Sequence, residues 1–273
     1  MMHDLVSFNY QITPASEIHL SAVTSIALYG KGVFTTVAIS DLKPFLWEKH
    51  WKRLNRNAKE TGIEISQFDE EEVKSELRRL LVRNDTRDGR SRITFFDESD
   101  SKIWNYGSRT KTSLLIQTSK LGVLSERFSL TVSDFRVNST SPLAGIKSCN
   151  YLDNLYAFED AKAKGFDEAV RLNECDEVVS ACMANIFWVK DGKLFTPALE
   201  TGCLSGTTRE WVLENHEVHQ TVASLDKLNE SDEIFLSSAG IGLRASGIIE
   251  TTTIPKEMPV YSKLKKTLDL DLS

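Results

Sequence analysis

Two segments in the first half of the chain repeat their apolar residues with the period of an α-helix. In residues 46–61 the repeat ends just before Gly62, which stands where a helix C-cap belongs. In residues 69–84 acidic side chains occupy the first turn and arginines lie toward the end, as the helix dipole favours. The apolar stripes are Trp47, Trp51, Leu54 and Ala58 in the first segment and Val73, Leu77, Leu80 and Leu81 in the second. We predict two amphipathic helices, each packed along one face.

Short runs rich in β-branched and aromatic residues surround these helices and predict strands. They cover residues 33–39, 92–96, 113–117 and 128–132. Between residues 117 and 127 the sequence turns polar, with Gly122 in its middle, which is typical of a connection between domains. We therefore predict a small N-terminal α+β domain over residues 1–118 and a larger C-terminal domain over residues 119–273.

The second half of the chain alternates strand-like runs with helical segments. We expect one helix over residues 152–164 and another that opens after residues 204–209. Strands are expected over residues 168–172, 178–190, 193–196 and 233–238. The Asp191-Gly192 pair predicts a two-residue hairpin, because a type I′ turn needs positive φ at both central residues. The expected fold class is thus α/β, of the α+β kind, with a C-terminal domain rich in β-structure and flanking helices.

Composition and charge argue against several classes of protein. The chain has 273 residues, a formal net charge of −6 and a pI near 5.5, so we expect no nucleic-acid partner. No run reaches the roughly 20 apolar residues of a membrane span, and the first residues lack the pattern of a signal peptide. We therefore expect a cytoplasmic protein with no membrane partner. The cysteines form no CxxC pair and no residue grouping has metal-ligand spacing, so we expect reduced thiols and no metal.

Two segments could hold an anion through their backbone. Residues 205–208 (SGTT) open a predicted helix, where N–H groups, the helix dipole and hydroxyls favour phosphate. Plain capping by Ser or Thr is the simpler interpretation of the same residues. Residues 237–242 (SSAGIG) follow a predicted strand, and their small side chains let a ligand approach the backbone. A tight turn at the strand end is the alternative there.

Lys147 is the candidate nucleophile. It follows a loop, and the only polar residues beside it are Ser148 and Cys149. A lysine in partly apolar surroundings can lose its proton near neutral pH and form a Schiff base with an aldehyde. A lysine that merely faces water is the alternative.

Five motifs, in order along the chain, resemble those of the fold-type IV pyridoxal-phosphate enzymes, the class IV aminotransferase family. Residues 29–36 (YGKGVFTT) resemble the N-terminal YGDGxFE segment, and residues 50–54 (HWKRL) resemble the HxxRL helix. Three later motifs resemble the lysine loop, the following hairpin and the LPGxTR phosphate loop. They are residues 145–151 (GIKSCNY), residues 184–187 (ANIF) with 196–197 (TP), and residues 204–209 (LSGTTR).

The resemblance implies pyridoxal 5′-phosphate as cofactor, a small-molecule substrate and a homodimer. It implies that Lys147 binds the cofactor covalently and moves the proton during the reaction. The phosphate contacts that it implies are Arg53, Thr207, Thr208, Ser238 and Ala239. Tyr151 falls where the branched-chain enzymes place a tyrosine against the ring oxygen. A packing role for Tyr151 and a solvated helix charge for Arg53 are the alternatives.

Within this family, several residues are similar to those of the 4-amino-4-deoxychorismate lyases. These are residues 34–36 (FTT), 143–147 (LAGIK) and 184–188 (ANIFW). The resemblance implies that Thr36 is catalytic and helps to protonate the departing enolpyruvyl carbon; an ordinary strand residue is the alternative. The expected function is a lyase that converts 4-amino-4-deoxychorismate to 4-aminobenzoate and pyruvate for folate biosynthesis.

Ser180 departs from the family pattern. The family has a glutamate five positions before the ANxF asparagine, where it pairs with the pyridine nitrogen of the cofactor, and this chain has Ser180 there. A carboxylate holds that nitrogen protonated, whereas a hydroxyl can only form a hydrogen bond. Glu177 is not expected to replace it, because an offset of three on a strand points to the opposite face. Lys31 likewise replaces the aspartate of YGDG.

Without the glutamate, the cofactor ring should withdraw electrons less strongly. This loss should slow a transaminase more than a lyase, because formation of an aromatic product supplies part of the driving force of the lyase reaction. Two alternatives remain open. One is a class IV aminotransferase, a transferase acting on branched-chain or D-amino acids. The other is a family member that has lost catalytic power and keeps the fold as a binding protein. Arg92 and Arg244 are weaker candidates for carboxylate binding, because an arginine near a strand end is more often a surface charge.

Overall fold

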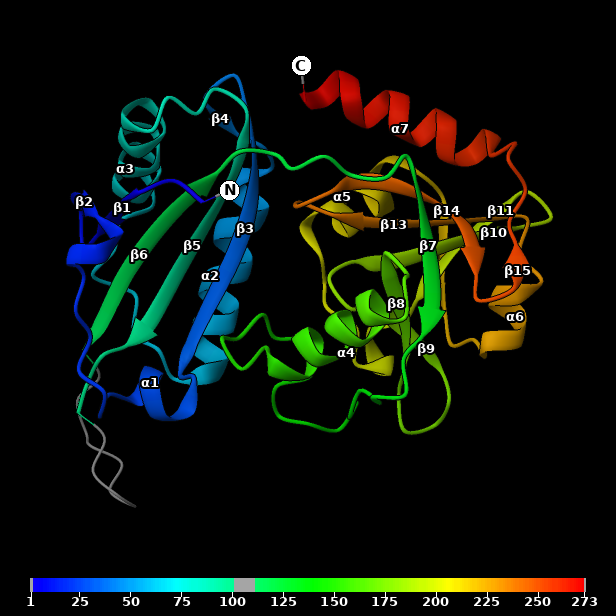
Figure 1. The fold of residues 1–273 in the computed structure, drawn as a ribbon, viewed down its shortest axis with the longest axis horizontal. Helices are drawn as coiled ribbons and strands as arrows, with labels where there is room; N and C mark the ends of the chain where they lie inside the picture. The colour runs from blue at the N-terminus through cyan, green and yellow to red at the C-terminus, as the bar shows by residue number, and fades with distance from the viewer. Residues whose placement is uncertain (1, 101–110, 273) are drawn as a thin grey trace. The chain divides into compact units, whose positions relative to one another are not determined.

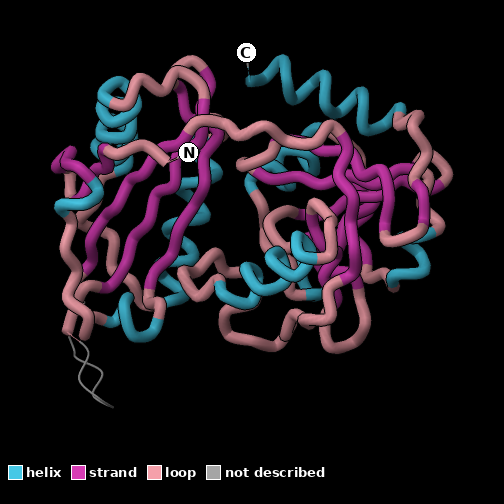
Figure 2. The backbone as a smooth tube through the Cα atoms, viewed as in Figure 1, coloured by secondary structure: helices cyan, strands magenta, loops and turns pink. Residues whose placement is uncertain are grey.

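A computed structural model describes residues 2–100 and 111–272, which form two compact units of mixed helix and strand (Figures 1 and 2). The first unit contains residues 1–122 together with residues 146–150, and the second contains residues 123–145 and 151–273. The boundary that we predict from the sequence stands at residues 118 and 119. The sequence does not indicate that residues 146–150 return to the first unit.

The first unit is a six-stranded antiparallel sheet with two long helices on one face (Figure 1). Its elements are β1 (Leu5–Phe8), β2 (Gln11–Pro14), α1 (Ser25–Tyr29), β3 (Gly32–Ser40), β4 (Lys43–Pro44), α2 (Trp47–Thr61), α3 (Glu70–Arg83), β5 (Gly89–Asp97) and β6 (Thr112–Ser119). The strand order is β2-β1-β6-β5-β3-β4. The two helices predicted from the apolar stripes are confirmed as α2 and α3.

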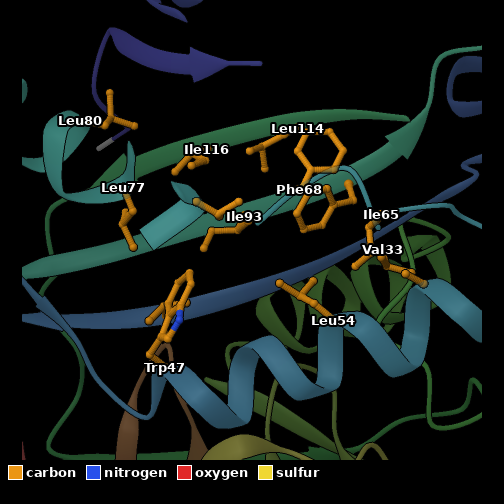
Figure 3. Packing of buried hydrophobic residues seen from close by; sticks show 14 of the residues in the cluster. Val33, Trp47, Leu54, Ile65, Phe68, Leu77, Leu80, Ile93, Leu114 and Ile116 are labelled. Atoms are coloured by element: carbon orange, nitrogen blue, oxygen red, sulfur yellow. The ribbon is translucent and has the colours of Figure 1, made fainter. Parts of the chain in front are cut away.

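One apolar core fixes these helices to the sheet (Figure 3). Trp47 and Leu54 project from α2 toward the strands, where Val33 and Ile93 lie buried. Alternate residues of each strand face this core, so the intervening residues face the other side of the sheet. Asp69 is the N-cap of α3, and its side chain accepts the N–H groups of Glu71 and Glu72.

The second unit is built on a nine-stranded mixed sheet. Its elements are β7 (Arg127–Val132), α4 (Leu152–Ala163), β8 (Glu168–Leu172), β9 (Val178–Ala181), β10 (Asn185–Lys190), β11 (Lys193–Pro197), α5 (Thr207–Asn215), β12 (Val218–Thr221), α6 (Leu225–Asn229), β13 (Glu233–Ser238), β14 (Gly242–Ile249), β15 (Thr252–Thr253) and α7 (Pro259–Leu272). The strand order is β12-β11-β10-β13-β14-β7-β8-β9, with β15 paired to β14. No helix within residues 2–100 and 111–272 has the length and apolar character needed to span a membrane.

The hairpin predicted at Asp191-Gly192 is confirmed, and both residues have positive φ, 50° and 73°. The prediction of one strand over residues 178–190 is wrong, because the chain turns between β9 and β10. Buried Glu168 accepts the backbone N–H groups of Cys182 and Met183, each at 2.9 Å. These two hydrogen bonds stabilise the turn that separates the strands.

Candidate active site

Lys147 lies in a short segment that extends the sheet of the first unit. Phe34 donates its backbone N–H to the carbonyl oxygen of Lys147 at 2.9 Å, and Cys149 donates to Gly32 at 2.8 Å. Gly145, just before this segment, has a φ of 72°, a left-handed conformation that residues with a Cβ rarely adopt. The glycine of the GIK motif therefore allows the turn that brings Lys147 against the beginning of β3.

Two cationic side chains form cation–π contacts with the ring of Phe34. Lys147 Nζ lies 4.5 Å from the ring centroid, and Arg92 Cζ lies 3.6 Å from the same point. Burial, together with the charges of Arg53 and Arg92, lowers the pKa of Lys147 to about 7. The neutral amine is therefore well populated at neutral pH, as a nucleophile or a proton acceptor requires. The sequence predicts the apolar surroundings of Lys147, but not the two guanidinium groups.

Thr36 lies on the same face of the sheet as Phe34. In the register of β3 and β5, Thr36 stands opposite Arg92, and Phe34 stands opposite Thr94. Residues directly opposite each other, and alternate residues along a strand, share a face. Thr36 is partly exposed, and its hydroxyl makes no hydrogen bond to any residue that the structure describes. Lys147 Nζ and the Thr36 hydroxyl thus belong to one surface of the first unit.

Arg53 is buried, with 6% of its surface exposed, so it is not a solvated helix charge. Its Nη2 donates to Thr35 Oγ1 at 2.7 Å, and the same oxygen lies 2.6 Å from His50 Nδ1. Residues three apart on a helix face the same way, which places the histidine and the arginine of HxxRL together. Burial, with the charges of Arg53 and Lys147, holds the pKa of His50 well below its usual value. The motif is a buried polar cluster around a neutral imidazole.

In the second unit, the segment predicted to bind an anion opens α5. Gly206 is its N-cap, and the first helical residues Thr207 and Thr208 are buried. Asn185 donates through Nδ2 to the carbonyl oxygen of Leu204 at 2.8 Å. A Cβ at Gly206 would overlap Asn185 Oδ1, so a residue without a side chain is needed here. The first turn of α5 lies at the positive end of the helix dipole, where backbone N–H groups favour an anion.

The end of β13 brings a second polar group to the same neighbourhood. Ser237 stands opposite Asn185 in the pairing of β13 with β10, and α5 packs on β13. Ser237 is fully buried, and its Oγ has no hydrogen-bond partner among the described residues. A buried hydroxyl without a partner costs free energy, and a phosphate oxygen would supply the missing acceptor. Ser238 and Ala239 follow at once, where Ile241 N–H closes a turn onto Ser238 O at 3.2 Å.

Arg209, which ends the LSGTTR motif, supports the loop. It is buried, and its Nη2 donates to Pro197 O at 2.9 Å and to Gln220 Oε1 at 2.8 Å. These hydrogen bonds connect the beginning of α5 to β11 and β12. The arginine of this motif therefore stabilises the loop and has its own acceptors.

Ser180 stands directly opposite Arg171 in the pairing of β9 with β8. Tyr151, just before α4, lies close enough to Arg171 for its phenol to affect the pKa of the guanidinium. Glu177 accepts a hydrogen bond from Asn173 Nδ2 at 2.7 Å, so its carboxylate is occupied away from Ser180. Lys31, in the first unit, forms an ion pair with Asp97 at 2.9 Å.

The structure places the predicted site residues in two groups. Lys147, Thr36 and Arg53 lie in the first unit, and Tyr151, Ser180, Thr207, Thr208, Ser238 and Ala239 lie in the second. The sequence motifs contain Thr35, His50 and Ser237 but do not indicate the hydrogen bonds of Thr35 and His50 or the unpartnered buried hydroxyl of Ser237, and sequence reasoning missed Arg171. A signal for Arg171 exists, because an arginine interrupts the otherwise strand-like run EAVRL.

Comparison with known proteins gives consistent results. The model of the family described as amino-transferase class IV matches residues 32–246. An aminodeoxychorismate lyase of Bacillus subtilis is 29% identical over 221 residues, covering 78% of this chain and 75% of that protein. A putative branched-chain-amino-acid aminotransferase of Methanocaldococcus jannaschii is 31% identical over 218 residues, covering 77% and 75%.

The fold is also that of a solved structure. The crystal structure of a branched-chain aminotransferase from Thermoproteus uzoniensis with norvaline superposes with a TM-score of 0.91 at 24% identity, covering 99% of this chain and 95% of that one. This match confirms the fold-type IV class expected from the sequence. The class IV family uses pyridoxal 5′-phosphate, which confirms the expected cofactor.

Proposed function

Because the chain belongs to the amino-transferase class IV family, we propose that it is a lyase that converts 4-amino-4-deoxychorismate to 4-aminobenzoate and pyruvate. The observation that carries this proposal is the pairing of Lys147 with Thr36 on one surface of the first unit. The Lys147 amine, with a pKa of about 7, lies over Phe34. The hydroxyl of Thr36, two residues further along the same strand, has no hydrogen-bond partner among the described residues. The second threonine of FTT distinguishes the lyase pattern from the aminotransferase FE.

The residues of this chain fit pyridoxal phosphate by their chemistry. Lys147 offers a neutral amine, Arg53 a buried guanidinium, and Ser237 a buried hydroxyl that lacks an acceptor among the described residues. When bound, the cofactor supplies an aldehyde for the substrate amine and a ring that withdraws electrons from the adjoining carbon.

Lys147 would act as the proton carrier of the reaction. Its pKa near 7 lets it accept a proton from substrate carbon and return it at neutral pH, since catalytic groups work best with a pKa near the working pH. Thr36 would direct a proton to the carbon of the departing enolpyruvyl group. Arg92, whose guanidinium lies over Phe34, is positioned on the same face to bind a substrate carboxylate.

The remaining residues would hold the cofactor. We assign phosphate binding to Arg53, Thr207, Thr208, Ser238 and Ala239, and contact with the ring oxygen to Tyr151. Thr35 positions Arg53 by accepting a hydrogen bond from its guanidinium, and buried His50 bonds to the same hydroxyl. The homodimer, the role in folate biosynthesis and the cytoplasmic location stay predictions.

A class IV aminotransferase is the second candidate, and the sequence comparison favours it equally. The aminotransferase from Methanocaldococcus jannaschii is as similar to this chain as the lyase from Bacillus subtilis. Ser180 weighs against it, because a transaminase depends more strongly on a protonated cofactor ring. The two candidates differ in one requirement, since only transamination consumes a keto acid acceptor.

The experiment follows pyruvate release from 4-amino-4-deoxychorismate with and without added keto acid. The lyase predicts equal rates in both; no pyruvate in either, with a keto acid formed from a branched-chain or D-amino acid only when an acceptor is added, would overturn it in favour of the transaminase. Lys147→Ala should abolish both the visible absorbance of the bound cofactor and the activity. An exposed lysine of α2, Lys52→Ala, is the matched control and should change neither.

Borohydride reduction of the protein with pyridoxal phosphate, followed by peptide mapping, tests the central assignment separately. The modified residue should be Lys147. A tag on another lysine, or an unchanged absorbance in Lys147→Ala, would mean that the protein does not use this residue.

A further inference from the structure

A buried arginine stands opposite the residue that replaces the family glutamate. Every residue of β8 is buried, and Arg171, with 2% of its surface exposed, is its one cation. In the register of β8 and β9 this arginine is the direct partner of Ser180, which is itself partly exposed. Directly opposed residues of an antiparallel pair share a face, with Cα atoms about 5 Å apart. The side chains of Arg171 and Ser180 therefore project from the same face of the sheet.

The guanidinium of Arg171 is fixed in place but keeps its charge. Nε and Nη2 donate to Phe135 O at 3.2 and 3.1 Å, and Nη2 also reaches Arg136 O at 3.3 Å. Carbonyl oxygens satisfy these donors without neutralising the positive charge. Nη1 has no acceptor, and no carboxylate forms an ion pair with Arg171, within the ranges that the structure describes.

Other groups near Arg171 do not cancel the charge either. The titratable side chains close enough to act on it are Cys182, Asp153 and Tyr151, and their effect is smaller than that of burial, which lowers the pKa of Arg171. An arginine remains protonated at neutral pH even so. Ser180 thus shares its face of β9 with a buried positive charge where a carboxylate would otherwise stand.

We propose that Ser180 and Arg171 together contact the ring nitrogen of the cofactor and hold it unprotonated. This inference rests on the proposed function and on the family motif, in which the residue at the position of Ser180 contacts the ring nitrogen. A second positive charge beside a guanidinium is unfavourable, so the neutral pyridine is preferred to the pyridinium. The neutral nitrogen has a lone pair that accepts a hydrogen bond from the Ser180 hydroxyl or from Arg171 Nη1. The loss of the glutamate and the charge of Arg171 therefore act in the same direction.

The pair has a consequence for the reactions that the site supports. An unprotonated ring withdraws fewer electrons, so reactions that depend on a stabilised carbanion are slowed. A reaction whose product becomes aromatic is less affected, because part of the driving force comes from the substrate. Arg171 and Ser180 are then specificity-determining residues. A glutamate placed alone at position 180 would pair with Arg171, so both residues must change to restore a protonated ring.

Nitrogen NMR measures the protonation state directly. The wild-type protein is loaded with pyridoxal phosphate labelled with ¹⁵N in the ring, reduced with borohydride, and its ¹⁵N shift is followed from roughly pH 6 to 9. We expect the shift of a neutral pyridine throughout, as in the deprotonated free adduct. Ser180→Glu combined with Arg171→Leu should give the shift of a pyridinium near pH 7. Arg171→Lys, which keeps the positive charge, should resemble wild type.

The outcomes separate this inference from the proposed function. A pyridinium shift in wild type at pH 7, with the label on Lys147, overturns the inference and leaves cofactor binding intact. No label on Lys147 refutes the proposed function and this inference with it. If the double variant does not fold, the wild-type spectrum and Arg171→Lys still decide, because a pyridinium shift in either contradicts the proposal.

Discussion

Lys147 and Phe34 are joined twice, once through the backbone and once through the side chains. The N–H of Phe34 bonds to the carbonyl oxygen of Lys147 at 2.9 Å, and Lys147 Nζ lies 4.5 Å from the Phe34 ring centroid. Both ends of the lysine are therefore held by one residue of a buried strand. The amine gains a fixed position, which a lysine on a surface loop lacks.

The first prediction concerns the reactivity of this amine with pH. Since the pKa of Lys147 is about 7 and only the neutral amine attacks an aldehyde, reaction with pyridoxal phosphate should rise through pH 7 and then level off. Arg92→Gln removes one charge that lowers this pKa, so the rise should move to higher pH. Arg56→Gln, on the exposed side of α2, is the control. A rate still climbing near pH 10, as for an ordinary lysine, would contradict the prediction.

The second prediction contrasts two adjacent threonines. Thr35→Val removes the oxygen shared by Arg53 and His50 in a buried site, which should lower the free energy of unfolding by about 1–3 kcal/mol. Thr36→Val changes a partly exposed residue that has no hydrogen bond in the described structure, so stability should stay within about 0.5 kcal/mol. Pyruvate release should nevertheless fall by about 10²–10⁴-fold in Thr36→Val, if its hydroxyl directs a proton. Denaturant midpoints and turnover measured together test this, and full turnover in Thr36→Val would remove Thr36 from the mechanism.

The third prediction concerns the beginning of α5. Gly206→Ala places a Cβ against Asn185 Oδ1, and we expect a loss of about 1–3 kcal/mol of stability together with weaker cofactor binding. Gly122→Ala is the matched control, since a Cβ there meets no atom within 4 Å and φ is not positive. Thermal unfolding and an absorbance titration with pyridoxal phosphate measure the two effects. Equal behaviour of the two variants would show that the loop relaxes without cost.

The fourth prediction concerns stability and pH at Glu168. Burial raises its pKa from 4.5 to about 7, although Ala169, Cys182 and Met183 donate backbone N–H groups to it. The folded chain therefore binds more protons than the unfolded chain between these pH values, and stability falls as pH rises across this range.

Glu168→Gln removes this titration. The stability of the variant relative to wild type should increase by up to about 3 kcal/mol between pH 4.5 and 7. Its absolute stability at low pH is expected to be lower, because an amide oxygen replaces two carboxylate oxygens that accept N–H groups. Glu257→Gln, at an exposed position, should leave the pH dependence unchanged. A difference that is constant with pH would exclude Glu168 as the titrating group.

Elements with a strong period of apolar residues could be predicted from the sequence. The helices α2 and α3 carry clear stripes and end signals, and the Asp-Gly hairpin follows from local turn chemistry. The strand β14 was missed because glycine, arginine and serine interrupt its run. The helix α7 was missed although Leu264 and Leu268 repeat at helical spacing after Pro259.

The residues of the candidate site that belong to sequence motifs could be predicted, but the contacts between them could not. The alternation of a strand implies that Thr36, and not Thr35, shares a face with Phe34, but only the register with β5 shows that Arg92 lies opposite Thr36. The pairing of Ser180 with Arg171 also depends on register, which includes an irregularity beside Arg171. Contacts between residues far apart in sequence leave no local pattern, and these contacts define the electrostatics of the site.

Because residues 146–150 return to the first unit, no single cleavage of the chain separates the two units completely. A fragment ending at residue 122 would contain Arg53 and Thr36 but no reactive amine. It would also leave the N–H of Phe34 and the carbonyl of Gly32 open along the side of β3, where a strand of another molecule could add. Separate expression of the first unit should therefore yield a self-associating sheet, unless the missing five residues are supplied as a peptide that completes its edge.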